Sequence, residues 1–308
     1  MAERTAILLL AHGTPDALDE IPEYLSNITG GRPMPESVIA EIRHRYSLIS
    51  ISPLTRLTLQ QGQLLSEKIG LPVYVGMRNW KPYIADTVLK MREDGITRIV
   101  AICLAPQNSR TSVGLYRRAL FTAAEAMPID FIEGWADHPL LADAFAEKLR
   151  AVLDDVHSAP VLFTAHSVPC RTVQTPAASD QTATQLKPDP YAVEAKQTAA
   201  LVAKRVGLST NNWFFAFQSQ GMSGGPWIGP TVEDTLTALR QQGATKVVID
   251  PIGFLCDHVE ILYDIDIAFR EFAGKLGMEL KRPESLNDSL LLTAALADLS
   301  NQGLARLD

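Results

Sequence analysis

Two histidines occupy matching positions in the two halves of the chain. Residues 6–15 read AILLLAHGTP and residues 160–169 read PVLFTAHSVP, so each histidine follows an apolar run and an alanine. His12 and His166 are separated by half of the 308-residue chain. A neutral imidazole can accept a proton or bind a transition metal near neutral pH. The two segments therefore predict acid–base or metal chemistry.

A second group of ionisable residues lies between positions 257 and 264. Asp257, Glu260 and Asp264 are spaced by three and four residues, which predicts a single face of a helix. This helix would follow a strand that ends near Gly253, and strand ends are where α/β sheets collect ligands. Carboxylates next to a neutral imidazole suit Fe²⁺ or Zn²⁺. The alternative is an acidic helix face that only water contacts.

Basic and phenolic side chains gather in predicted loops and helix starts of the first half. The group includes Arg45, Tyr46, Arg78, Arg110 and Tyr116. In a chain with a net charge of −7, such arginines are candidates for pairing with ligand carboxylates, which a guanidinium does in bidentate fashion. The alternative is that they are ordinary surface charges.

Apolar runs that would position these residues alternate with amphipathic stretches. The runs predict strands at residues 5–11, 72–77, 98–104, 130–133, 160–165, 213–218, 246–250 and 278–281. Helical periodicity fills the intervals, including residues 35–48, 190–206 and 257–274. This alternation is typical of βαβ units, so the predicted fold class is α/β with parallel sheets.

The repeated segments predict two domains, residues 1–150 and 151–308. The last helix would pack back onto the first domain. If the halves face each other, both histidines reach one cleft, because each stands at the carboxyl end of a buried strand.

Composition excludes several classes of protein. Hydrophobic residues make up 46% and charged residues 20%, as in a soluble globular protein. The acidic balance and the lack of a basic run argue against nucleic-acid binding. No apolar stretch reaches the roughly 20 residues of a membrane span, and no signal peptide is evident, which predicts a cytoplasmic protein. The three cysteines are widely spaced, which predicts no iron–sulfur cluster.

Several short motifs, taken in order, resemble those of the ferrochelatase family over nearly the whole chain. They are Ile51-Ser-Pro-Leu54, Leu104-Ala-Pro-Gln107, Thr164-Ala-His166-Ser-Val-Pro169, Asp189-Pro-Tyr191, Phe217-Gln-Ser219, Gly225-Pro-Trp227 and Gly253-Phe254 followed by Asp257-His258 and Glu260. The resemblance implies two Rossmann-like domains that flank a porphyrin cleft. It also implies insertion of Fe²⁺ with loss of two pyrrole protons.

The resemblance further implies roles for individual residues. His166 and Glu260 would be the catalytic pair and the metal ligands, and Asp257 and Asp264 would relay protons or metal. The residues expected to contact the porphyrin are His12, Arg45, Tyr46, Ser52 and Tyr116. His12 stands where close relatives often have tyrosine, and it would bind the metal from the opposite face. Thr29 and Ala268 replace an arginine and an acid that are usual in the family.

Within the family, the chain is most similar to the short bacterial enzymes that act on coproporphyrin III. The support is the length and the polar segment 31–36. The expected partners are coproporphyrin III, Fe²⁺ as a substrate and a downstream haem-pathway enzyme, with no required cofactor and a monomeric chain. The alternatives are a protoporphyrin IX ferrochelatase, a sirohydrochlorin or cobalt chelatase, and a non-catalytic carrier of tetrapyrrole or metal.

Overall fold

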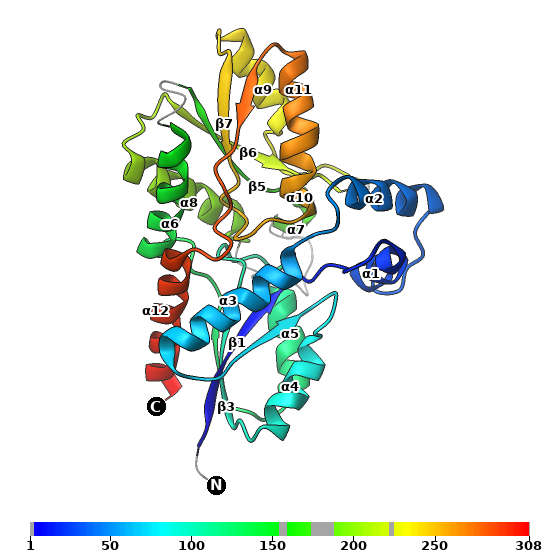
Figure 1. Cartoon of the computed structure of the whole chain (residues 1–308), viewed down its shortest axis with the longest axis vertical. Helices are drawn as coiled ribbons and strands as arrows, with labels where there is room; N and C mark the ends of the chain where they lie inside the picture. Colours follow the sequence, from blue (N-terminus) through cyan, green and yellow to red (C-terminus); the bar gives the residue numbers. More distant parts are fainter. Residues whose placement is uncertain (1–2, 154–158, 174–187, 222–224, 308) are drawn as a thin grey trace, which may run out of the picture.

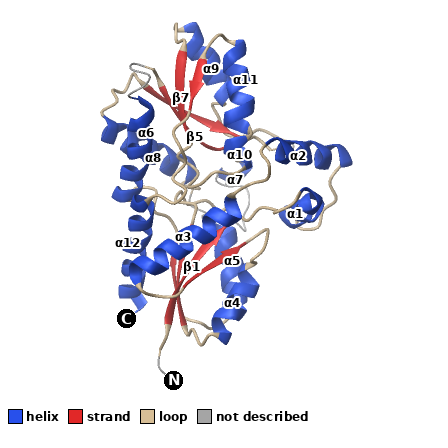
Figure 2. Ribbon diagram, viewed as in Figure 1, coloured by secondary structure: helices blue, strands red, loops and turns tan. Residues whose placement is uncertain are grey.

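The chain forms two four-stranded parallel sheets, one from each half (Figures 1 and 2). The structure is a computed structural model that describes residues 3–153, 159–173, 188–221 and 225–307. The strands of the first sheet are β1 (Thr5–Ala11), β2 (Val73–Met77), β3 (Arg98–Cys103) and β4 (Ile129–Ile132). Those of the second are β5 (Val161–His166), β6 (Trp213–Gln218), β7 (Lys246–Asp250) and β8 (Glu279–Lys281). The predicted α/β class with parallel sheets is confirmed.

The two sheets share one strand order. The first is β2-β1-β3-β4 and the second is β6-β5-β7-β8, so the first strand of each half lies inside its sheet. Leu9 of β1 pairs with Val75 and Ile102, and Phe163 of β5 pairs with Phe215 and Asp250. Because both faces of these inner strands are covered, the apolar residues of β1 and β5 are buried. Each inner strand delivers its histidine at the carboxyl end.

Helices cover the sheets and project beyond them. Those before the second sheet are α1 (Ile21–Thr29), α2 (Glu36–Leu48), α3 (Leu54–Ile69), α4 (Ile84–Glu93), α5 (Val113–Ala124) and α6 (Pro139–Leu153). Those that follow are α7 (Cys170–Val173), α8 (Tyr191–Val206), α9 (Val232–Gln241), α10 (Val259–Leu262), a π-helix (Asp264–Phe269), α11 (Arg270–Lys275) and α12 (Leu290–Leu307). Within the described residues, no helix combines the length and apolarity needed to cross a bilayer.

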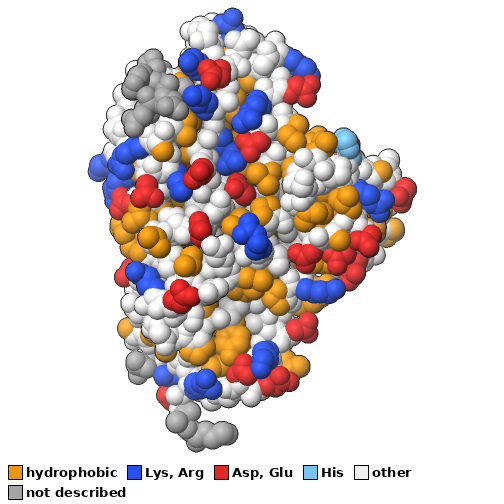
Figure 3. All heavy atoms as spheres, viewed as in Figure 1, with side chains coloured by type: hydrophobic (Ala, Val, Ile, Leu, Met, Phe, Trp, Pro, Cys, Tyr) orange, Lys and Arg blue, Asp and Glu red, His pale blue; other side chains and the backbone are white. Residues whose placement is uncertain are grey.

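Two helices cross between the halves. The C-terminal α12 packs on α3, β3 and β4 of the first sheet, while α6 packs on α8 and β7 of the second (Figure 1). One hydrophobic cluster consequently contains Ile7 and Val100 of the first sheet together with Phe163 and Val248 of the second. The expected return of the last helix is therefore observed, whereas the domain boundary at residue 150 stays a prediction. On the face shown in Figure 3, basic side chains are interspersed with acidic ones.

Candidate active site

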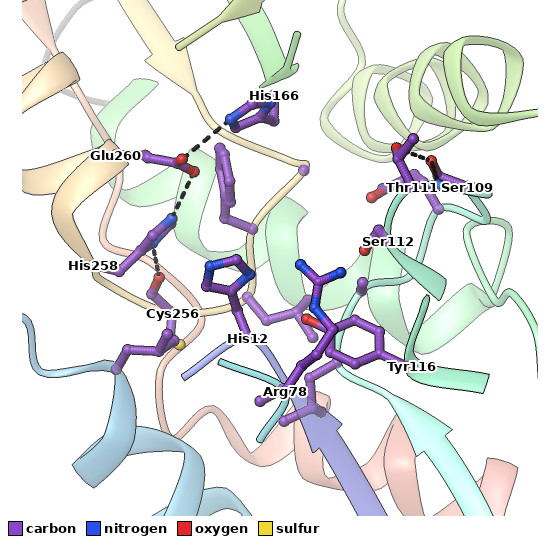
Figure 4. Close-up of a pocket in the computed structure, with 18 of the residues that line it drawn as sticks. His12, Arg78, Ser109, Thr111, Ser112, Tyr116, His166, Cys256, His258 and Glu260 are labelled. Carbon is purple, nitrogen blue, oxygen red and sulfur yellow. Dashed lines mark hydrogen bonds and ion pairs between the residues drawn. The ribbon is translucent and has the colours of Figure 1, made fainter. Parts of the chain in front are cut away.

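A cavity of about 370 Å³ lies at the carboxyl ends of both sheets. Its walls come from the ends of β1, β3, β5 and β7 and from the segments that follow them. His12 and His166 both line it, as the strand pattern predicted (Figure 4). The two halves therefore contribute to a single site.

Close backbone contacts fix both strand ends. Gly13, directly after the first histidine, has a φ of +83°, and a Cβ there would lie 2.9 Å from Trp80. A Cβ on Gly253 would lie 2.8 Å from Ala165 of β5. Only glycine permits either approach. The second contact brings the segment after β7, which carries Glu260, against the end of β5.

Glu260 lies between two histidines. Its Oε1 is 3.1 Å from His166 Nε2, and its Oε2 is 3.3 Å from His258 Nε2 (Figure 4). The Nδ1 atom of each ring also faces a backbone carbonyl oxygen. For His166 this is the carbonyl of Ser167, and for His258 it is the carbonyl of Cys256 at 3.0 Å. Since oxygens face both ring nitrogens of His166, the protonated imidazole fits this site best.

The charges in this group shift the proton affinities. Burial by itself lowers the pKa of His166, but the Glu260 carboxylate outweighs it and raises that pKa to about 9. Burial opposes ionisation of Glu260, yet His166 and then His258 bring its pKa well below the usual range. The resting pair is thus an imidazolium and a carboxylate at neutral pH, rather than the neutral imidazole that the sequence suggested.

His12 has the opposite character. Burial, followed by the charge of Arg78, lowers the pKa of His12 to about 4, so its ring is neutral. The Asn79 amide nitrogen lies 3.2 and 3.1 Å from the two ring nitrogens, and the Tyr24 ring stands edge-on at 6.2 Å. A neutral imidazole that faces a cavity offers a lone pair to a metal.

Polar groups line another wall of the same cavity. The Arg78 guanidinium lies 5.6 Å from the centre of the Tyr116 ring, and Ser109, Thr111 and Ser112 lie nearby on the segment that enters α5 (Figure 4). The Nε atom of Arg78 is buried and has no hydrogen-bond partner among the described residues. This carboxylate-binding wall, Arg78 with the three hydroxyls and Tyr116, suits the carboxylates of a ligand.

Three residues expected to contact the porphyrin lie outside the cavity lining. Arg45 pairs with Glu41, and its Nη1 is 3.9 Å from Asp264 Oδ1. Tyr46 is 2% exposed within the cluster of α1 and α2, and Ser52 is 5% exposed, where its Oγ accepts from the Leu54 amide as α3 begins. Arg45 is thus close to the carboxylates beside the cavity, while Tyr46 and Ser52 support the elements around it.

The expectation that three carboxylates share one helix face is wrong. Asp257 precedes α10 and accepts hydrogen bonds from Ser285 and Asn287, with Arg282 at 3.4 Å. Asp264 instead accepts a hydrogen bond from the Ser219 hydroxyl. It is the first residue of the π-helix, whose wider turns point the side chains in other directions than an α-helix would. Burial raises the pKa of Asp264 to about 6. Asp264 therefore lies within electrostatic reach of Glu260 and His166, while Asp257 is held by Ser285, Asn287 and Arg282.

Several cavity residues received no role from the sequence. His258, Tyr24 and Tyr191 all line the cavity. His258 lies inside one of the motifs named above, two residues before Glu260, so the sequence could have predicted it as a site residue. Tyr24 comes from α1, and nothing in its local sequence ties it to His12. Trp227, part of the Gly-Pro-Trp motif, also lines the cavity.

Comparison with solved structures identifies the architecture. The sirohydrochlorin chelatase SirB of Bacillus subtilis, solved with Fe³⁺, superposes with a TM-score of 0.61 over 98% of this chain and 96% of its own. The sequences are only 12% identical, so the likeness concerns the fold. The fold is that of the two-sheet chelatases.

The sequence comparisons narrow the class. The ferrochelatase family model matches residues 4–304. A ferrochelatase of Acidobacterium capsulatum is 68% identical over 100% of this chain and 97% of its own length. A coproporphyrin III ferrochelatase of Geobacillus thermodenitrificans is 32% identical over 99% and 98%. The chain belongs to the ferrochelatase family, and its activity is the insertion of iron into a porphyrin.

Proposed function

We propose that the porphyrin is coproporphyrin III. The observation that carries this proposal is the carboxylate-binding wall, where Arg78 and three hydroxyl-bearing residues line the same cavity as His166 and Glu260. Coproporphyrin III has four propionates, whereas protoporphyrin IX has two and two vinyl groups. A wall rich in charged and hydroxyl donors favours the substrate with more carboxylates. The name of the relative from Geobacillus thermodenitrificans supports the same substrate.

His166 and Glu260 then exchange a proton for iron. Fe²⁺ that reaches Glu260 displaces the proton of the His166 imidazolium to solvent, because a dication replaces its positive charge beside the carboxylate. When iron passes to the pyrrole nitrogens, the pair regains its proton affinity. His166 accepts one of the two pyrrole protons, and Glu260, whose pKa is low beside the imidazolium, passes the other on to Asp264. Iron entry into the ring is thereby coupled to proton departure from it.

His12 and Asp264 have the supporting roles. The neutral His12 ring binds iron from the face opposite to His166. Asp264, whose pKa of about 6 lies near neutrality, passes protons from Glu260 to solvent. The relay is assigned to Asp264 alone, because the carboxylate of Asp257 is already engaged by Arg282, Ser285 and Asn287.

The test is anaerobic incubation of the enzyme with Fe²⁺ and, separately, coproporphyrin III, protoporphyrin IX or sirohydrochlorin, followed by absorbance. We expect the highest kcat/KM with coproporphyrin III. A preference for protoporphyrin IX or sirohydrochlorin would overturn the assignment of coproporphyrin III as the substrate. Binding of all three tetrapyrroles without metallation of any would overturn the proposed mechanism. That the chain is monomeric, cytoplasmic and independent of a cofactor stays a prediction.

A further inference from the structure

Asp189 is a buried carboxylate that joins the two halves beside the cavity. Its side chain is 1% exposed. One oxygen accepts from the Tyr191 amide at 3.0 Å, where α8 begins, and the other accepts from the Arg110 amide at 2.9 Å with Arg110 Nε at 3.4 Å. A carboxylate removed from water to this extent must be paired. Asp189 therefore ties the segment between β3 and α5 to the start of α8.

The Tyr191 side chain extends this connection to His166. Its hydroxyl donates to the His166 carbonyl at 2.8 Å. The ring is 8% exposed, lines the cavity and packs 6.3 Å from the centre of the Phe217 ring. The phenol thus fixes the backbone of the residue that accepts the pyrrole proton.

Two further bonds make α8 a rigid support for the same segment. Glu194 accepts from the Asn108 amide at 2.6 Å, and Gln107 donates to the Thr198 hydroxyl at 3.1 Å. Positions 191, 194 and 198 recur at helical spacing, so they present one face of α8. The segment held in this way, residues 107–112, carries the three hydroxyls of the carboxylate-binding wall.

We propose that Asp189 and Tyr191 are positioning residues that fix His166 relative to the carboxylate-binding wall. The proposal rests on the roles given above to that wall and to His166. A porphyrin bound at its propionates meets the imidazole in a productive position only if the wall and the imidazole keep their spacing. A displacement of about 1 Å can cost up to about 100-fold in rate.

The test uses Tyr191→Phe, Asp189→Asn and the double variant of the full chain. Asparagine keeps one oxygen for the Tyr191 amide but cannot accept from Arg110 with its NH₂. For Fe²⁺ insertion, we expect each single change to lower kcat about 10-fold while the porphyrin KM changes less than about 2-fold. Because both residues act in one chain of contacts, the double variant should be no slower than the slower single variant.

The matched control is Tyr74→Phe, which removes a phenol that donates to Asp94 at 2.8 Å, remote from the cavity. Its kcat should equal that of the parent. Unchanged kcat in Tyr191→Phe, or single effects that multiply to about 100-fold in the double variant, would overturn the proposal. If Asp189→Asn does not fold, the Tyr191→Phe variant, which differs from the parent by a single oxygen atom, decides the proposal alone. If the parent enzyme prefers another porphyrin, the coproporphyrin assignment fails, and the same series on that porphyrin still tests the positioning.

Discussion

Glu260 stands between two imidazoles in the cavity where we place the insertion of iron. The carboxylate lies 3.1 Å from His166 and 3.3 Å from His258, so proton and metal compete for the same oxygens. Such competition makes metal affinity depend on pH. The chemistry of the site follows from this one carboxylate and its neighbours.

The first prediction concerns the proton acceptor. His166→Ala should lower iron insertion by about 10²–10⁴-fold, the range typical of a lost general base. Coproporphyrin binding, followed by fluorescence, should persist because the opposite wall is unchanged. The matched control is His44→Ala on the exposed face of α2, which should leave the rate unaltered. Retained turnover in His166→Ala would contradict the assignment.

The pKa of His166 gives a second prediction. In the metal-free enzyme, NMR should show the His166 imidazole titrating near pH 9, because the Glu260 charge stabilises its protonated form. Glu260→Gln removes that charge, so the midpoint should fall to about 6.5 or below. Iron insertion by the parent enzyme should accelerate as pH rises from 6 towards 8.5, since Fe²⁺ then meets a smaller fraction of enzyme with a protonated His166. A midpoint that Glu260→Gln leaves unmoved would show that the pair does not interact.

His12 supplies a third prediction. If its neutral ring binds the iron of the product, His12→Ala should change the absorption spectrum of the enzyme–product complex and speed product release. His12→Tyr should give a different spectrum again, because a phenol is a different ligand. Identical spectra in all three proteins would exclude His12 as a ligand.

At the scale of elements, the strands and the helical segment after β7 could be predicted, but the directions in which the acidic side chains of that segment point could not. Runs such as residues 5–11 are apolar throughout because β1 is covered on both faces. The segment 257–274 has helical periodicity, but its facing depends on distant partners. Arg282 attracts Asp257, and Ser219 bonds Asp264, and neither contact is encoded locally. For the same reason Tyr24 and Tyr191 became site residues only through tertiary contacts, Tyr24 with His12 and Tyr191 with His166.

The docking of α12 gives a prediction with an internal control. A Cβ on Gly303 would lie 2.4 Å from Val100 Cγ1 and 2.9 Å from Asp130, so Gly303→Ala should destabilise the fold by about 1–3 kcal/mol. Gly274 of α11 has nothing within 4 Å, so Gly274→Ala should stabilise it by up to about 1 kcal/mol through helix propensity. Denaturant unfolding measures both. A gain of stability in Gly303→Ala would show that α12 does not pack this closely.

At the scale of the whole molecule, the two sheets share one core. The cluster that contains Ile7 and Phe163 also includes side chains of α6, α8 and α12, so neither half buries its inner face alone. The cavity therefore has walls that depend on each other for stability. Arg78 and Tyr116 on one wall and the His166–Glu260 pair on the other are held by a common framework.

This shared core predicts a single cooperative unfolding transition, although chains of this length often unfold domain by domain. Far-UV circular dichroism and tryptophan fluorescence should give one coincident midpoint, since Trp135 and Trp213 report on opposite halves of the same cluster. Gly303→Ala should shift that midpoint without splitting it, because loosening α12 weakens the core common to both sheets. Two separated transitions, or a shift seen by one probe only, would mean that the halves are stable independently and that α6 and α12 do not couple them.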